Sequence, residues 1–237
     1  MEKKNICLGV IGGMGPLASQ MFYGMVIDNT EAACDQDHID MLILSHASMP
    51  DRTRAIKEGR IEELFARLLD DARFLERSGA GYIAIPCNTS HVLIDRLQKE
   101  IGIPIINMVK ESAAEVRRHH GSGAMAGIMA TDGTIATGLY QKALEEEDIV
   151  PVIPSQENQK KVMRIIYDGI KAGRSVDPED LRAVRSEFDE KGCTCGLLAC
   201  TELSCYKIME KLPEYYMDSM EVLAKKAVTF CGKELRQ

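Results

Sequence analysis

The chain has no apolar stretch long enough to cross a membrane. A spanning helix needs about 18 or more consecutive apolar residues, and every apolar run in this sequence is shorter. The first five residues lead directly into a short apolar segment, without the hydrophobic core and cleavage site of a signal peptide. We therefore expect a cytoplasmic protein that does not interact with membranes.

The chain also has no excess of positive charge. Asp and Glu number 36 and Lys and Arg number 29, so the formal net charge is −7. Proteins that bind nucleic acids or anionic lipid surfaces generally carry the opposite sign, so we expect neither partner. An anionic small-molecule substrate remains compatible with this charge, because a buried site sets its own local potential. The hydrophobic content of 45% and charged content of 27% are ordinary for a globular protein.

The eight cysteines do not form a regular framework. Their uneven spacing in a chain of 237 residues without a secretory signal argues against structural disulfides. The spacing of the last cluster matches no common zinc or iron–sulfur pattern, so we expect no metal. Most of these thiols should be reduced core or surface residues, and only position distinguishes them. The cysteines occupy positions 7, 34, 87, 193, 195, 200, 205 and 231.

Short apolar segments alternate with segments of helical periodicity along the whole chain. This alternation favours a parallel sheet with helices on both faces. The predicted strands are 6–11, 41–44, 83–85, 103–107, 124–130, 149–154 and 196–199. The predicted helices are 17–31, 61–78, 92–97, 110–120, 135–147, 156–172, 178–191 and 217–235.

The pattern restarts after Gly121–Gly123. The segment Gly9–Pro16 aligns with Gly127–Thr134 at an offset of 127 − 9 = 118 residues, and Cys87 and Cys200 are 200 − 87 = 113 residues apart. We therefore predict two similar parallel-sheet α/β domains related by a pseudo-two-fold axis. Such domains would face each other across a cleft that holds the active site, with one cysteine on each side.

Cys87 and Cys200 each follow an apolar run and open a helical pattern. Ligands gather at the carboxyl ends of parallel strands, and helix N-termini stabilise thiolates. A reaction that removes a proton from one face of a carbon and returns one on the other needs two such groups, one protonated and one not. The alternative is that both are inert buried thiols, which is the commoner situation for a single cysteine. Two cysteines at equivalent strand ends favour the catalytic interpretation.

The residues after the two cysteines could bind a carboxylate. Backbone N–H groups at Asn88–Thr89 and Thr201–Glu202 can form anion-binding nests, although Asn and Thr also cap helices without any ligand. Glu202 could raise the pKa of Cys200 or position its thiol. It could equally be an ordinary acidic residue in a first helical turn.

Other strand ends carry further candidates. Arg52 could hold a substrate carboxylate through a bidentate guanidinium, although a surface charge is the usual explanation for a loop arginine. In the loop Gly12–Pro16 and the residues after it, Gly13–Ala18 formally fits a dinucleotide fingerprint but lacks its acidic partner, so a substrate wall or small-anion loop fits better. Thr131 and Thr134 occupy the corresponding second loop. His91 could contact Cys87 across one helical turn, but the orienting acid of a Cys–His hydrolase cannot be placed.

Taken together, these motifs resemble the aspartate/glutamate racemase family, and its aspartate-racemase branch in particular. They keep their order and extend over almost the whole chain, which makes the combination specific although each motif alone is weak. The matching segments are Gly12–Pro16, Met49–Thr53, Pro86–His91, Ala130–Thr134, Ile165–Tyr167 with Lys171–Gly173, and Cys200–Leu203.

The resemblance implies racemisation by two thiols without pyridoxal phosphate or any other cofactor. Cys87 and Cys200 fall on the family's two acid/base positions, Arg52 on its side-chain carboxylate binder and Lys171 on another substrate-contacting position. The lining positions correspond to Met14, Thr53, Asn88, Thr89, Thr131 and Thr201. The resemblance also implies a homodimer and a C-terminal helix that returns to the first domain. The expected domains are residues 1–112 with helix 214–237, and residues 113–213.

Aspartate is the expected substrate, and several alternatives stay open. Within the racemases, glutamate or a broader set of amino acids could be used. Related enzymes with paired cysteines, such as maleate isomerases and hydantoin racemases, act on other acids. A non-catalytic protein that binds a small acid would retain the same residues.

Overall fold

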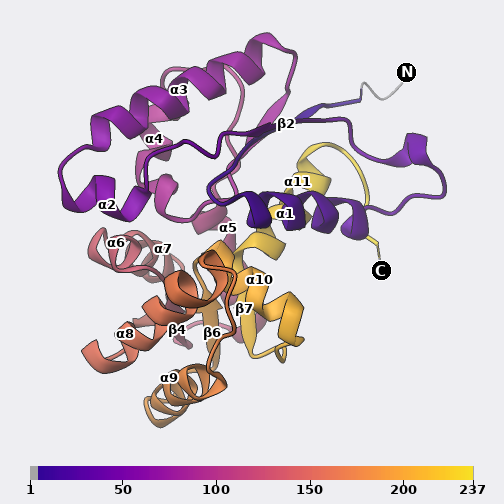
Figure 1. Cartoon of the computed structure of the whole chain (residues 1–237). Helices are drawn as coiled ribbons and strands as arrows, with labels where there is room; N and C mark the ends of the chain where they lie inside the picture. Colours follow the sequence, from indigo (N-terminus) through magenta and orange to yellow (C-terminus); the bar gives the residue numbers. More distant parts are fainter. Residues whose placement is uncertain (1–4, 237) are drawn as a thin grey trace. The chain divides into compact units, whose positions relative to one another are not determined.

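The computed structural model describes residues 5–236, and the chain divides into two compact units (Figure 1). The first unit contains the residues up to Met108 and those from Met220 onward, and the second contains Val109–Ser219. The chain therefore leaves the first unit once and returns to it at its C-terminal helix.

The first unit is built on a parallel sheet of three strands in the order β2-β1-β3. All five residues of the central strand β1 are buried. The strands are β1 (Leu8–Gly12), β2 (Met41–Ser45) and β3 (Tyr82–Ala84). The helices are α1 (Pro16–Asn29), α2 (Arg52–Lys57), α3 (Ile61–Arg77), α4 (Ile94–Gln98) and α11 (Ser219–Phe230), with short 3₁₀ segments η1 (Asp35–Asp37) and η2 (Thr89–Leu93). Helix α5 (Met108–His120) leads into the second unit.

Helix α3 shows how the sequence determines packing in the first unit. Its buried residues recur at helical spacing on one face: Leu64, Leu68, Ala72 and Leu75. Burying each leucine stabilises the fold by about 1.5–3 kcal/mol. Gly9 in β1 allows this close approach, because a Cβ there would lie 3.1 Å from Leu75 Cδ1 and 3.0 Å from Ala80 Cβ. The helix therefore packs directly on the central strand.

The second unit repeats the plan of the first with one added strand. Its parallel sheet has the order β5-β4-β6-β7. In each unit the first strand along the chain therefore lies between the second and the third. The strands are β4 (Met125–Met129), β5 (Val150–Val152), β6 (Cys195–Leu198) and β7 (Tyr216–Asp218). The helices are α6 (Asp132–Ala136), α7 (Leu139–Glu146), α8 (Gln156–Met163), α9 (Pro178–Glu190) and α10 (Thr201–Glu210), and the π-helical segment η3 spans Arg164–Lys171.

This architecture confirms the predicted fold class of two similar parallel α/β units. Three predicted elements were wrong in detail. Residues 103–107 form only a single bridge, Ile83 to Ile105, rather than a strand. The helix expected over 135–147 is broken at Gly138, whose φ of 66° separates α6 from α7. The last helix begins at Ser219 rather than at 214 or 217, because residues 216–218 form strand β7 against β6.

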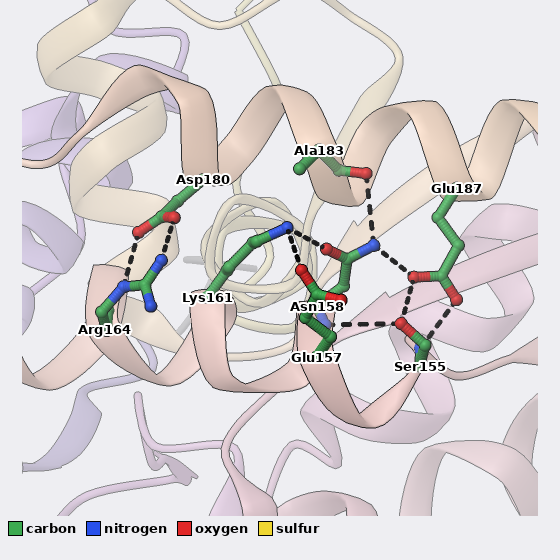
Figure 2. A network of polar contacts seen from close by, with 8 residues as sticks. All are labelled: Ser155, Glu157, Asn158, Lys161, Arg164, Asp180, Ala183 and Glu187. Carbon is green, nitrogen blue, oxygen red and sulfur yellow. Dashed lines mark hydrogen bonds and ion pairs between the residues drawn. The ribbon is translucent and has the colours of Figure 1, made fainter.

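A polar network fastens α9 to α8 within the second unit (Figure 2). The carboxylate of Glu187 accepts hydrogen bonds from the Ser155 amide at 2.7 Å, the Ser155 hydroxyl at 2.8 Å and the Asn158 side-chain amide. Partial burial opposes ionisation, yet contacts with Lys191, Asn158 and Ser155 lower the pKa of Glu187 to about 2. The network anchors the helix from which the π-helical segment η3 continues.

Candidate functional site

Cys87 lies in a tight turn just beyond the carboxyl end of β3. Its backbone N–H donates to the Ile85 carbonyl at 2.7 Å, and its side chain is buried. The expected helix does not begin directly at the thiol, because a 3₁₀ turn (η2) starts at Thr89 and α4 follows with only five residues. Helix-dipole stabilisation of the Cys87 thiolate, expected from the sequence, therefore has no support in the structure.

Ser90 is the side-chain partner of Cys87. Its hydroxyl donates to Cys87 Sγ at 3.1 Å and also lies 3.5 Å from Met14 Sδ, and the side chain is fully buried. The sequence analysis assigned Ser90 no role of its own. Its position three residues after Cys87 was the available signal, because a 3₁₀ turn brings residues i and i+3 together.

His91 contacts Cys87 as predicted, but through the backbone rather than the thiol. Its Nδ1 lies 2.9 Å from the Cys87 carbonyl oxygen, and the Met108 backbone N–H donates to its Nε2 at 3.1 Å. Because Nε2 accepts, Nδ1 must carry the proton and donate. Burial lowers the pKa of His91 to about 4, against hydrogen bonds that oppose the shift. The imidazole is therefore neutral and holds the Cys87 turn to the start of α5.

Arg52 connects the loop that contains Met14 with the segment that leads into α2. It is the first residue of α2, and its guanidinium donates to the Met14 carbonyl at 2.9 Å and to the Pro50 carbonyl at 3.0 Å. Contacts thus run from Arg52 to Met14, from Met14 to Ser90, and from Ser90 to Cys87. The remaining predicted residues of this unit are buried on the same loops: Thr53, Asn88 and Thr89.

Cys200 and Thr131 are adjacent at the sheet edge of the second unit. Strands β4 and β6 pair with Met129 opposite Leu198, so Thr131 and Cys200 each lie two residues beyond that pair. Thr131 caps α6 by accepting from the Thr134 amide, and Cys200 occupies the N-cap position of α10. The carboxyl edge of this sheet therefore presents a thiol and a hydroxyl from neighbouring strands.

Cys200 is hydrogen-bonded to the buried carboxylate of Glu202, which forms an ion pair with Lys171. Its Sγ donates to Glu202 Oε2 at 2.9 Å, and Lys171 Nζ lies 2.9 Å from Glu202 Oε1. Burial, and then the charge of Glu202, raise the pKa of Cys200 well above its ordinary value, while Lys171 acts in the opposite direction. The backbone N–H of Glu202 at the helix N-terminus does lower the pKa of Cys200, as expected, but burial and the Glu202 carboxylate outweigh it.

Two buried hydrogen bonds hold the segments on either side of Cys200 in place. Ser204 on α10 donates to Asp218 Oδ1 at 2.5 Å, and Ser219 donates to the Leu198 carbonyl at 2.7 Å. The first contact ties α10 to strand β7, and the second ties the end of β6 to Ser219, the residue directly after β7. The strand that the sequence analysis missed is therefore part of the support of this thiol.

Within residues 5–236 no group of three or more His, Cys, Asp and Glu side chains is arranged to hold a metal ion. In the same range no helix is both long and apolar enough to span a membrane.

Two parallel α/β units, each with a cysteine after its third strand, define the architecture of two-domain racemases. The fold of Picrophilus torridus aspartate racemase matches with a TM-score of 0.77 at 27% identity, covering 98% of this chain and 96% of that one. An aspartate racemase homologue from Pyrococcus horikoshii has the same fold, with a TM-score of 0.77 at 24% identity over 95% of this chain and 99% of that one.

The chain belongs to the Asp/Glu/hydantoin racemase family, whose model matches residues 11–227. Over 228 residues it is 28% identical to the broad-specificity amino-acid racemase RacX of Bacillus subtilis (strain 168), which covers 94% of this chain and 96% of RacX. The family resemblance inferred from the sequence motifs is thus confirmed.

Proposed function

We propose that the protein is a cofactor-independent amino-acid racemase, with aspartate as its main substrate and Cys87 and Cys200 as its two acid/base groups. The observation that carries this proposal is the equivalent position of the two thiols. Each is buried just beyond the third strand of its unit and is hydrogen-bonded to a neighbouring side chain. Membership of a racemase family and the likeness to an aspartate racemase support it.

The proposed reaction is a proton exchange at Cα. One cysteine, as thiolate, takes the Cα proton and becomes a thiol, and the electron pair remains on Cα as a carbanion. The other cysteine, as thiol, gives its proton to the opposite face and becomes a thiolate. One C–H bond breaks and one forms, so atoms and charge balance without an oxidant or a co-reactant. Two groups are required because a single base reaches only one face of the carbon.

The proposed binding residues supply positive charge and hydrogen-bond donors for a dicarboxylic substrate. Arg52 would hold the side-chain carboxylate, since its guanidinium is fixed by two carbonyl contacts. Backbone N–H groups after each thiol would hold the α-carboxylate. Lys171 would contact the substrate near the second thiol, where it already pairs with Glu202. The proposed lining residues are Met14, Thr53, Asn88, Thr89, Thr131 and Thr201.

A broader amino-acid specificity is the second candidate, because the chain is similar over nearly its full length to RacX, a racemase described as broad in specificity. A panel of amino acids decides between the two. Aspartate-selective turnover supports the first candidate, and comparable rates on several amino acids with unrelated side chains support the second.

The test follows optical rotation with each enantiomer of aspartate and glutamate, under reducing conditions and after dialysis without added cofactor. The protein should racemise aspartate, and Cys87→Ala and Cys200→Ala should each lower the rate by at least about 10³-fold, because each removes an acid/base group that the reaction needs. Cys34→Ala, which changes an exposed thiol, is the matched control and should leave the rate unchanged. Near-normal turnover by either active-site variant would contradict the two-thiol assignment.

We also propose that the enzyme is a homodimer and works in the cytoplasm. The family resemblance supports the dimer, and the eight cysteines, which are all free in the structure, suit a reducing compartment. Light scattering of the purified protein and fractionation of the cells that make it would test the two points separately.

A further inference from the structure

We propose that the two thiols are unequal at rest: Cys87 is prepared to act as the base and Cys200 as the acid. This inference rests on the proposed two-thiol racemisation. It adds Ser90 and Glu202 as the residues that set the starting protonation state. The hydrogen bonds at the two sulfurs run in opposite directions: Cys87 accepts one from Ser90, and Cys200 donates one to Glu202.

At Cys87 the sulfur accepts a hydrogen bond from its neighbour. The Ser90 hydroxyl has one proton to donate, and the two atoms it faces are the sulfurs of Cys87, at 3.1 Å, and Met14, at 3.5 Å. A thioether is only a weak neutral acceptor, whereas a hydrogen bond to an ionised sulfur is charge-assisted and stronger. The geometry of Ser90 therefore favours the deprotonated form of Cys87.

The neighbouring histidine does not alter this assignment. Both nitrogens of the His91 ring are occupied, one by the Cys87 carbonyl and the other by the Met108 amide. Burial also keeps the ring neutral by lowering its pKa to about 4. His91 thus fixes the turn without exchanging a proton with the thiol.

At Cys200 the sulfur donates a hydrogen bond to its neighbour. An ionised carboxylate has no proton to donate, so the contact of 2.9 Å between Cys200 Sγ and Glu202 Oε2 requires the thiol form of the cysteine. Lys171 Nζ forms an ion pair with the other carboxylate oxygen, Glu202 Oε1, at 2.9 Å. Tyr140, another titratable group near Cys200, is fully buried, and burial raises its pKa, so it stays neutral. Burial and the Glu202 carboxylate therefore hold this sulfur protonated, and the opposing charge of Lys171 is the smaller effect.

The difference has to be measured on the thiols themselves. The two enantiomers have equal free energies in water, so kcat/KM must be equal in both directions whichever thiol is ionised at rest. Alkylation avoids this constraint, because iodoacetamide reacts with the thiolate and not with the thiol. Peptide mass spectrometry after a short pulse then reports each cysteine separately.

In the wild-type protein without substrate, we expect Cys87 to be alkylated at pH 7 on the order of tenfold faster than Cys200 or more. The gap should narrow as the pH is raised, because Cys200 then gains thiolate. Exposed Cys34 serves as the reference for reagent reactivity, and fully buried Cys195 reports any unfolding. A gap that does not change with pH would reflect access alone and would overturn the inference.

Two variants with matched controls separate ionisation from access. Glu202→Gln should speed alkylation of Cys200, because it removes the charge that holds the thiol protonated. Ser90→Ala should slow alkylation of Cys87, because it removes the donor to the thiolate. The controls are Glu210→Gln, at an exposed position on the same helix as Glu202, and Ser78→Ala at an exposed position, and neither should change either rate.

Racemisation of aspartate is measured on the same samples, so the two proposals can fail independently. Faster alkylation of Cys200 than of Cys87 in a protein that racemises aspartate overturns the inference and leaves the function intact. The expected order of alkylation in a protein that racemises no amino acid overturns the function.

Discussion

At the scale of single residues, His91 links the candidate site to the stability of the fold. Its ring bridges the Cys87 carbonyl and the Met108 amide, and the contact in which Nε2 accepts from the Met108 N–H requires the neutral imidazole. The folded-state pKa of about 4 lies below the ordinary value of 6.5. A lowered histidine pKa means that the unfolded chain binds a proton more tightly than the folded one. The stabilisation is therefore complete above pH 6.5 and is lost as the pH falls from 6.5 to 4.

We expect protonation of His91 to lower the free energy of unfolding by about 3 kcal/mol between pH 7 and pH 4. Within that range the free energy should change by about 1.4 kcal/mol per pH unit. Urea titrations at several pH values measure it. His91→Gln should be less stable at pH 7 and should lack this part of the slope. Equal slopes in the two proteins would show that His91 does not titrate as its burial indicates.

The partners of the two thiols mark the limit of what sequence reasoning could predict at this scale. The positions of Cys87 and Cys200 followed from apolar runs that end at a thiol. That Ser90 donates to Cys87 depends on a 3₁₀ turn where a regular helix was expected. That Lys171 reaches Glu202 depends on contact between η3 and α10, which lie about 30 residues apart in the sequence and carry no shared pattern.

At the scale of elements, glycines determine how closely helices approach the sheets. A Cβ at Gly127 in β4 would collide with the ring of Phe188 on α9. Gly24, in the middle of α1, has no other atom within 4 Å of the position a Cβ would take. The two glycines thus differ in whether the space beside them is filled.

Gly127→Ala and Gly24→Ala should therefore have opposite effects on stability. Overpacking at Gly127 should lower the free energy of unfolding by about 1–3 kcal/mol. Alanine at Gly24 should raise it by about 0.5–1 kcal/mol, because it restricts the unfolded chain and favours the helix. Denaturant unfolding of both variants tests the pair, and a shift of the same sign and size in both would contradict this account of β4 packing.

The elements that the sequence predicted correctly are those with strong local patterns. Helix α3 has 17 residues with a clear apolar face, and β1 is an apolar run bounded by a glycine-rich loop. The errors fell where a local break or a long-range contact interrupts the pattern, as at Gly138 and at strand β7. Strand β7 has three residues whose extended form comes from pairing with β6, a long-range contact that no local pattern reveals.

At the scale of the whole molecule, the chain uses one plan twice. The strand order β2-β1-β3 recurs as β5-β4-β6, and the candidate cysteine follows the third strand in both units. The restart at Gly121–Gly123 made this duplication visible in the sequence. The opposite hydrogen bonding of the two thiols was not visible there, because it depends on how the Ser90 and Glu202 side chains lie against each sulfur.

The partition of deuterium during the first few per cent of turnover in D₂O tests the two-thiol mechanism most directly. L-aspartate is the substrate, and nuclear magnetic resonance and chiral chromatography report the label at Cα in each enantiomer. If separate thiols remove and return the proton, the D-aspartate formed carries solvent deuterium while the remaining L-aspartate keeps its proton. Equal deuterium in recovered substrate and product, or a product that retains the original proton, would show a single base and contradict the account.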